Sequence, residues 1–150
     1  MTDQSLKMGR ESRHISLSQI GEQGQKLISN ATILIVGMGG LGCASANYLN
    51  SSGIKKMFIC DFDSIDATNL GRQVLFGPSD IGKQKVLIAK QQLEKINPKI
   101  DIKTINKKIN QQELMRLDLV KNTIILDCSD NFNTRFEINK YCVKNNHYLV

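Results

Sequence analysis

The chain has 150 residues, of which 41% are hydrophobic and 23% are charged, and its formal net charge is +6. This balance is typical of a folded single domain, and it excludes disordered, collagen-like and low-complexity chains. No apolar stretch reaches the roughly 18 residues that a membrane-spanning helix needs, so we expect no contact with a membrane.

The N-terminal third of the sequence predicts a helical arm followed by a strand–turn–helix unit. Residues 1–30 form the arm, with a helix that begins near Ser18, and residues 31–150 form one larger domain. In this domain, short β-branched runs alternate with helical patterns. Strands are expected over 32–36, 56–61, 100–104, 123–127 and 147–150, and helices over 41–52, 83–96, 111–119 and 133–145.

This alternation indicates the α/β class, a doubly wound, Rossmann-like and mainly parallel sheet with helices on both faces. Residues 147–150 form the last predicted strand, and nothing follows to cover its face. We therefore expect a sheet that is truncated at its last strand. The alternative is a covered edge strand.

A glycine-rich turn follows the first predicted strand directly. Gly37, Gly39 and Gly42 have the Gly-x-Gly-x-x-Gly spacing, which lets backbone N–H groups approach a phosphate at a helix N-terminus. Asp61 ends the second strand, where a carboxylate can accept hydrogen bonds from ribose hydroxyls. The glycines could instead only pack helix on strand, but strand, spacing and acid together favour nucleotide binding. They do not identify the nucleotide.

Two cations follow in the next loop and helix. Arg72 and Lys85 are suited to neutralising the phosphates of a nucleoside triphosphate, and Lys85 lies in the first turn of a helix, where a cation is unfavourable without an anion to meet. A plain surface loop remains the alternative for this segment.

A third strand end supplies another carboxylate. Asp130 follows the strand over 123–127, and the carboxyl ends of parallel strands share one edge of the sheet. Since Mg²⁺ takes one or two carboxylates together with phosphate oxygens, Asp130 is the candidate metal ligand. Asp130 or Asn131 could also be merely the N-cap of the next helix.

The lysines and cysteines carry less information. Lys103, Lys107 and Lys108 form the densest basic cluster, and no aromatic residue lies between them, so we interpret it as a solvated face and expect no nucleic-acid partner. The four cysteines lack zinc spacing and no signal-peptide pattern precedes them, so we expect buried free thiols and a cytoplasmic protein.

Over residues 10–150 the chain resembles the HesA/MoeB/ThiF family, the bacterial relatives of the ubiquitin-activating enzymes. Seven motifs occur in the order found in that family, at residues 10–15, 37–42, 61–63, 69–73, 80–85, 96–98 and 127–135. The loop over 77–83 looks closest to the ThiF branch.

The resemblance implies an ATP-dependent adenylyltransferase. Such an enzyme activates the C-terminal glycine carboxylate of a small ubiquitin-like sulfur-carrier protein as an acyl-adenylate and releases pyrophosphate, in thiamine or molybdenum cofactor biosynthesis. It implies Mg²⁺ as a cofactor and a homodimer in which Arg13 reaches the partner's ATP. Residues 31–150 would then be an ATP-binding domain.

The same resemblance implies the site residues. Arg13, Arg72, Lys85 and Asp130 would be catalytic. The nucleotide would be bound by Gly37, Gly39, Gly40, Gly42, Asp61, Asp63, Asn69, Arg72, Gln73, Lys85, Ser129, Asp130 and Asn131, with the metal on Asp130.

Part of the family pattern is missing from this chain. Family members continue with two Cys-x-x-Cys pairs that bind structural Zn²⁺ and often with a sulfur-transfer cysteine, so zinc is expected only in that missing C-terminal part. Two alternative functions stay open. One is an NAD-binding oxidoreductase domain, supported by the glycine motif and Asp61, and the other is an inactive, truncated interaction module.

Overall fold

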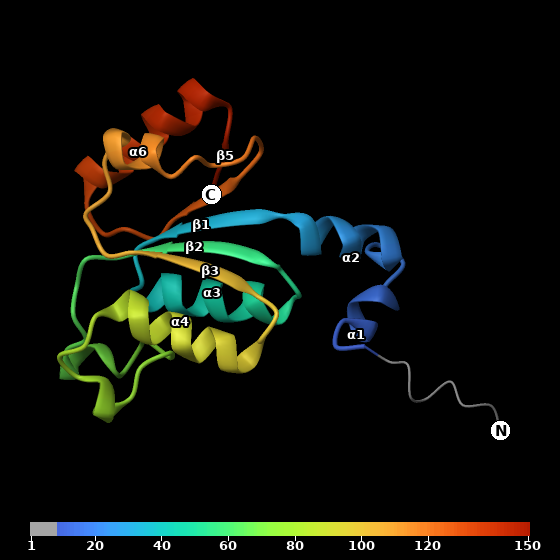
Figure 1. Cartoon of the computed structure of the whole chain (residues 1–150), viewed down its shortest axis with the longest axis horizontal. Coiled ribbons are helices and arrows are strands. Elements are labelled where there is room, and N and C mark those ends of the chain that lie inside the picture. Colours follow the sequence, from blue (N-terminus) through green and yellow to red (C-terminus); the bar gives the residue numbers. More distant parts are fainter. Residues whose placement is uncertain (1–8) are drawn as a thin grey trace.

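The computed structural model describes residues 9–150 and contains a five-stranded parallel sheet with helices on both faces (Figure 1). The predicted doubly wound fold is therefore confirmed. The strands lie in the order β3-β2-β1-β4-β5. Their bounds are Thr32–Val36 for β1, Lys56–Cys60 for β2, Asp101–Ile105 for β3, Ile124–Asp127 for β4 and Tyr148–Leu149 for β5.

The register of the sheet brings four strand ends to one edge. Val36 at the end of β1 is paired with Cys60 of β2 and with Asp127 of β4, and Cys60 is paired with Ile105 of β3. The loops that follow these four strands therefore begin side by side. Side chains that are far apart in the sequence can meet there.

Two separate apolar layers hold the sheet between helices. Helices α3 (Gly40–Ser51) and α4 (Lys85–Ile96) cover one face, where Ile33 and Ile35 of β1 are buried. Helices α5 (Gln111–Arg116) and α6 (Phe132–Asn145) cover the other face, where Leu34 and Val36 are buried. This explains why β1 reads as an unbroken apolar run, since both of its faces are inside.

The N-terminal arm differs from its prediction. It contains a short α1 (Ser12–Ile15) and then α2 (Gly21–Asn30), instead of one helix from about Ser18. The reason is Gly21, whose φ of 58° is left-handed and separates the two helices. Residues 1–8 of the predicted arm lie outside the described residues. No helix within 9–150 is long and apolar enough to cross a membrane.

A buried amide ties the arm to the domain. Gln25 of α2 is only 6% exposed, and its Nε2 donates a hydrogen bond to the carbonyl oxygen of Ser52 at 2.8 Å. Its Oε1 lies 3.2 Å from Nδ1 of His14, on α1. One side chain thus connects α1 to the C-terminal end of α3.

The glycine turn after β1 has no room for side chains at two of its positions. Gly37 has a φ of 96°, and a Cβ there would lie 2.6 Å from the carbonyl oxygen of Cys128. A Cβ on Gly42 would lie 1.8 Å from the carbonyl oxygen of Gly37. The turn is therefore packed tightly between α3 and the loop after β4. Gly39, in contrast, would direct a Cβ into open space.

Two aspartates hold the long segment between β2 and α4. Asp66 accepts hydrogen bonds from the backbone N–H and the hydroxyl of Thr68, and these bonds lower the pKa of Asp66. Asp80 accepts a hydrogen bond from the Gly77 N–H at 3.0 Å and lies 3.2 Å from Nζ of Lys83. The Gly77 N–H, followed by Lys83, lowers the pKa of Asp80.

We predict that Gly42→Ala destabilises the protein by at least about 3 kcal/mol, because its methyl group would overlap a backbone oxygen. Gly39→Ala is the matched control and should cost less than about 1 kcal/mol, since its methyl group meets nothing. Urea unfolding followed by far-UV circular dichroism measures both values. Equal losses in the two variants would contradict the geometry of the turn.

We predict that Asp80→Asn lowers the free energy of unfolding by about 1 kcal/mol at neutral pH. Because the folded state lowers the pKa of Asp80, this contribution is complete above the unfolded pKa of about 4 and is lost as the pH falls further, through the folded value. Urea unfolding from pH 7 to pH 3 should therefore show the two proteins converging in acid. A constant difference down to pH 3 would refute the assignment.

Candidate functional site

A pocket of about 480 Å³ opens at the edge where the four strand ends meet. It lies at the point where the strand order reverses, between β1 and β4, which is the usual place for ligands in open parallel sheets. All the nucleotide-binding residues expected from the sequence, except Gly42, line this pocket. The sheet thus brings together residues that come from five separate segments of the chain.

Two of the expected residues are not at the pocket. Gly42 is buried behind it, where its missing side chain permits the contact with Gly37, so its part in the site is structural. Arg13 lies exposed on α1, in the N-terminal arm, and does not line the pocket of its own chain.

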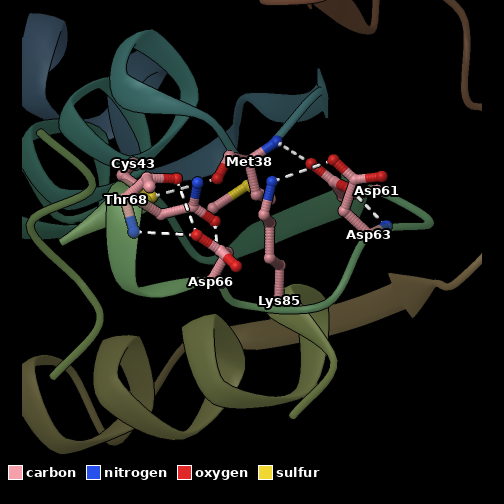
Figure 2. A network of polar contacts seen from close by, with 8 residues as sticks. Met38, Cys43, Asp61, Asp63, Asp66, Thr68 and Lys85 are labelled. Atoms are coloured by element: carbon pink, nitrogen blue, oxygen red, sulfur yellow. Dashed lines mark hydrogen bonds and ion pairs between the residues drawn. The ribbon is translucent and has the colours of Figure 1, made fainter. Parts of the chain in front are cut away.

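Asp61 connects two loops at the pocket (Figure 2). One carboxylate oxygen accepts a hydrogen bond from the N–H of Met38, in the glycine turn, at 2.6 Å. The other accepts one from the N–H of Asp63 at 2.8 Å. The carboxylate therefore fixes the turn after β1 against the segment after β2. Each oxygen still has a second lone pair that can accept a ligand donor.

Lys85 is the buried cation of the pocket. It is the first residue of α4, and only 7% of its side chain is exposed. Its Nζ lies 3.0 Å from Oδ2 of Asp63, and its backbone N–H donates to the carbonyl oxygen of Asp63 at 3.1 Å (Figure 2). The ammonium group is thus held at the pocket wall in a defined position.

Arg72 is a solvent-exposed cation of the pocket. Its stem lies next to Gly40, where a Cβ would be 3.4 Å from Cγ of Arg72, and Nη1 donates to the carbonyl oxygen of Thr68. Nearby, Asn69 accepts a hydrogen bond from the N–H of Asp66 through its side chain. The turn over Ala67–Asn69 therefore helps to hold the side chain of Arg72 in place.

Beside the pocket, Gln73 carries a buried acceptor without a partner within 9–150. It is 2% exposed and lines the pocket, and its Oε1 is buried without a hydrogen-bond partner among the described residues. A buried acceptor without a partner is unfavourable by about 1–3 kcal/mol. A donor on a bound ligand or an ordered water molecule would remove this cost.

The loop after β4 shows which of Asp130 and Asn131 is the N-cap of α6, a question that the sequence left open. Asn131 is the N-cap of α6, and its side chain accepts a hydrogen bond from the N–H of Thr134 at 3.0 Å. The N–H and hydroxyl of Ser129 both donate to Asp127. Asp130 is left exposed at the pocket rim. Within 9–150, no three His, Cys, Asp or Glu side chains form a metal cluster, so a cation on Asp130 would need ligand oxygens as well.

All three lysines of the basic cluster are solvent-exposed, as interpreted from the sequence, but two of them also line the pocket. Lys107 and Lys108 line the pocket together with Ile109 and Phe62, whereas Lys103 lies over the ring of Phe58. The signal that could have found them is their position. They follow directly after β3, and so they reach the same edge as the glycine turn.

The thiols of the chain are not activated. Burial raises the pKa of Cys43 and of Cys60 to about 12 and that of Cys142 to about 11. Burial also raises the pKa of Cys128, which lines the pocket. All four cysteines are free, as predicted, and they are protonated at neutral pH, so none is a ready nucleophile.

Known proteins resemble this chain in sequence and in structure. The molybdopterin-synthase adenylyltransferase of Haemophilus influenzae is 39% identical over 94% of this chain and 56% of its own length. The sulfur carrier protein ThiS adenylyltransferase of Escherichia coli is 36% identical over the same shares. A crystal structure of E. coli MccB with ATP superposes with a TM-score of 0.84 at 34% identity, over 97% of this chain and 44% of that protein.

The chain spans about half the length of the curated relatives it matches. The two adenylyltransferases are almost equally similar to it, so the expected closeness to the ThiF branch stays a prediction. The model of the ThiF family itself matches residues 11–150. This match covers nearly all of the described residues, and the chain belongs to the ThiF family.

Proposed function

We propose that this chain supplies the nucleotide site of an adenylyltransferase that activates the C-terminal carboxylate of a ubiquitin-like sulfur-carrier protein with Mg·ATP. One observation carries the proposal, namely that Arg72, Lys85 and Asp130 line one pocket with the glycine turn. A dinucleotide site needs the turn and Asp61 alone, whereas a triphosphate with a metal also needs two cations and a carboxylate.

The proposed reaction is a displacement at the α-phosphorus of ATP. A carboxylate oxygen of the carrier forms the new P–O bond, the bond to the bridging oxygen of the β-phosphate breaks, and pyrophosphate leaves with the electron pair. Lys85 and Arg72 would neutralise the charge that builds on the phosphates, and the N–H groups of the glycine turn would face them. With no covalent step on the protein, positioning and charge neutralisation supply the rate.

Asp130 is the residue that we propose for Mg²⁺. Its side chain is exposed, and it lines the same pocket as the two cations. Bound Mg²⁺ would draw charge from the phosphate oxygens that it contacts. Asp61 is proposed for the ribose, through the lone pairs that its two backbone bonds leave free.

We propose a homodimer in which Arg13 acts on the partner's pocket. In support, Arg13 is exposed and lies away from the pocket of its own chain, on an arm held in place by Gln25. The carrier protein is proposed by class, because relatives named for ThiS and for molybdopterin synthase match almost equally. The four free thiols suit a reducing cytoplasm, and we propose no structural zinc on these 150 residues.

We predict that Arg72→Ala and Asp130→Ala each lower carrier-dependent exchange of labelled pyrophosphate into ATP by at least about 100-fold, because each removes charge stabilisation of the phosphates. Lys99→Gln is the control matched in charge to Arg72→Ala. Lys99 is exposed and lies outside the pocket, so its exchange rate should stay within about twofold of the unaltered protein.

Unchanged exchange in both pocket variants would remove the proposed roles of Arg72 and Asp130, and the absence of carrier-dependent exchange in the unaltered protein would remove the adenylyltransferase proposal. Tight binding of NADH that ATP does not displace would instead support the oxidoreductase alternative. Protein that binds neither nucleotide would support the inactive interaction module.

The contribution of Arg13 can be separated from that of the pocket by mixing subunits. We expect Arg13→Ala and Lys85→Ala each to be inactive alone, but an equal mixture to regain about a quarter of the exchange activity. Half of the dimers are then mixed, and one of their two sites combines an intact pocket with an intact arm. Activity no higher than the sum of the separate variants would refute action across the dimer.

A further inference from the structure

The two partners of the ion pair between Lys85 and Asp63 differ greatly in solvent exposure. The side chain of Lys85 is 7% exposed and that of Asp63 is 50% exposed. A buried ammonium group is stable only with an anion beside it, whereas a half-exposed carboxylate can exchange its partner for water at little cost. The lysine therefore depends on the aspartate far more than the aspartate depends on the lysine.

The backbone keeps the two residues together whatever the side chains do. The N–H of Lys85 donates to the carbonyl oxygen of Asp63, and Ser64 forms an antiparallel bridge with Gln84. Figure 2 shows the stem of Lys85 running up from α4 to meet the carboxylate of Asp63. Within 9–150, Asp63 is the one carboxylate that forms an ion pair with Lys85. Both side chains line the pocket.

From this asymmetry we infer that Asp63 is a displaceable counter-ion. It holds and aims Lys85 while the pocket is free, and a phosphate of the ligand takes its place at Nζ while Asp63 turns into solvent. The inference rests on the proposed polyphosphate site, and it changes the role expected for Asp63. Asp63 is a positioning residue that competes with the ligand, and it does not hold the nucleotide.

Removing the charge of Asp63 distinguishes a competitor from a ligand. In Asp63→Asn, Lys85 has no anion in the free protein, so the free protein should lose stability. A phosphate then meets no competing carboxylate, so tripolyphosphate should bind roughly tenfold more tightly than to the unaltered protein. A residue that held the nucleotide or its metal, or that merely shaped the loop, would produce weaker binding.

Isothermal titration calorimetry measures the affinities for tripolyphosphate without metal and for ATP with Mg²⁺. We expect Asp63→Asn to bind both probes more tightly and to unfold at a lower temperature when no ligand is present. Glu94→Gln is the matched control, because it removes one negative charge from the outer side of α4. Its affinities should stay within about twofold of those of the unaltered protein.

A double variant tests whether the effect passes through Lys85. In the background of Lys85→Met, which keeps the apolar stem, Asp63→Asn should no longer tighten binding. Weaker binding by Asp63→Asn, or equal tightening in the Lys85→Met background, would overturn the inference. If the unaltered protein binds neither probe, the proposed polyphosphate site itself is wrong, and this outcome is separate from the others.

Discussion

The buried carboxylate of Asp61 is the interaction on which the rest of the site depends. Its two oxygens accept backbone N–H groups from Met38 and from Asp63, so one side chain joins the loops after β1 and β2. Charged acceptors of this kind form short, strong hydrogen bonds. Because Asp63 also contacts Lys85, the position of the buried cation follows from the same carboxylate.

The parallel sheet explains how charged residues from separate segments of the chain come to line one pocket. Parallel strands end at one edge, and the helices that return the chain run on the outside of the sheet. Each loop at this edge therefore needs to supply only one or two charged side chains to the pocket. Arg72 and Lys85 come from the segment after β2, Lys107 from the loop after β3 and Asp130 from the loop after β4.

Periodicity and spacing were sufficient for the fold, the glycine turn and the charged residues at the strand ends, whereas Asn69 and Gln73 were expected only from the family resemblance. The apolar run of β1 and the glycine spacing are local patterns. The structure confirms the buried strand and the tight turn that they predicted. Other features depended on distant partners. The break at Gly21, the place of Lys107 beside the pocket and the pairing of Asp63 with Lys85 depend on tertiary packing, which one stretch of sequence does not contain.

The side-chain amide of Gln25 connects the N-terminal arm to α3. It joins α1 to residue 52, just past the end of α3, and the opposite end of that helix begins at the glycine turn. Helix α3 is therefore in contact with the arm at one end and with the pocket at the other. Thermodynamic reciprocity then requires that, if a ligand in the pocket shifts α3, a shift of α3 imposed through the arm changes the affinity for that ligand by the same factor.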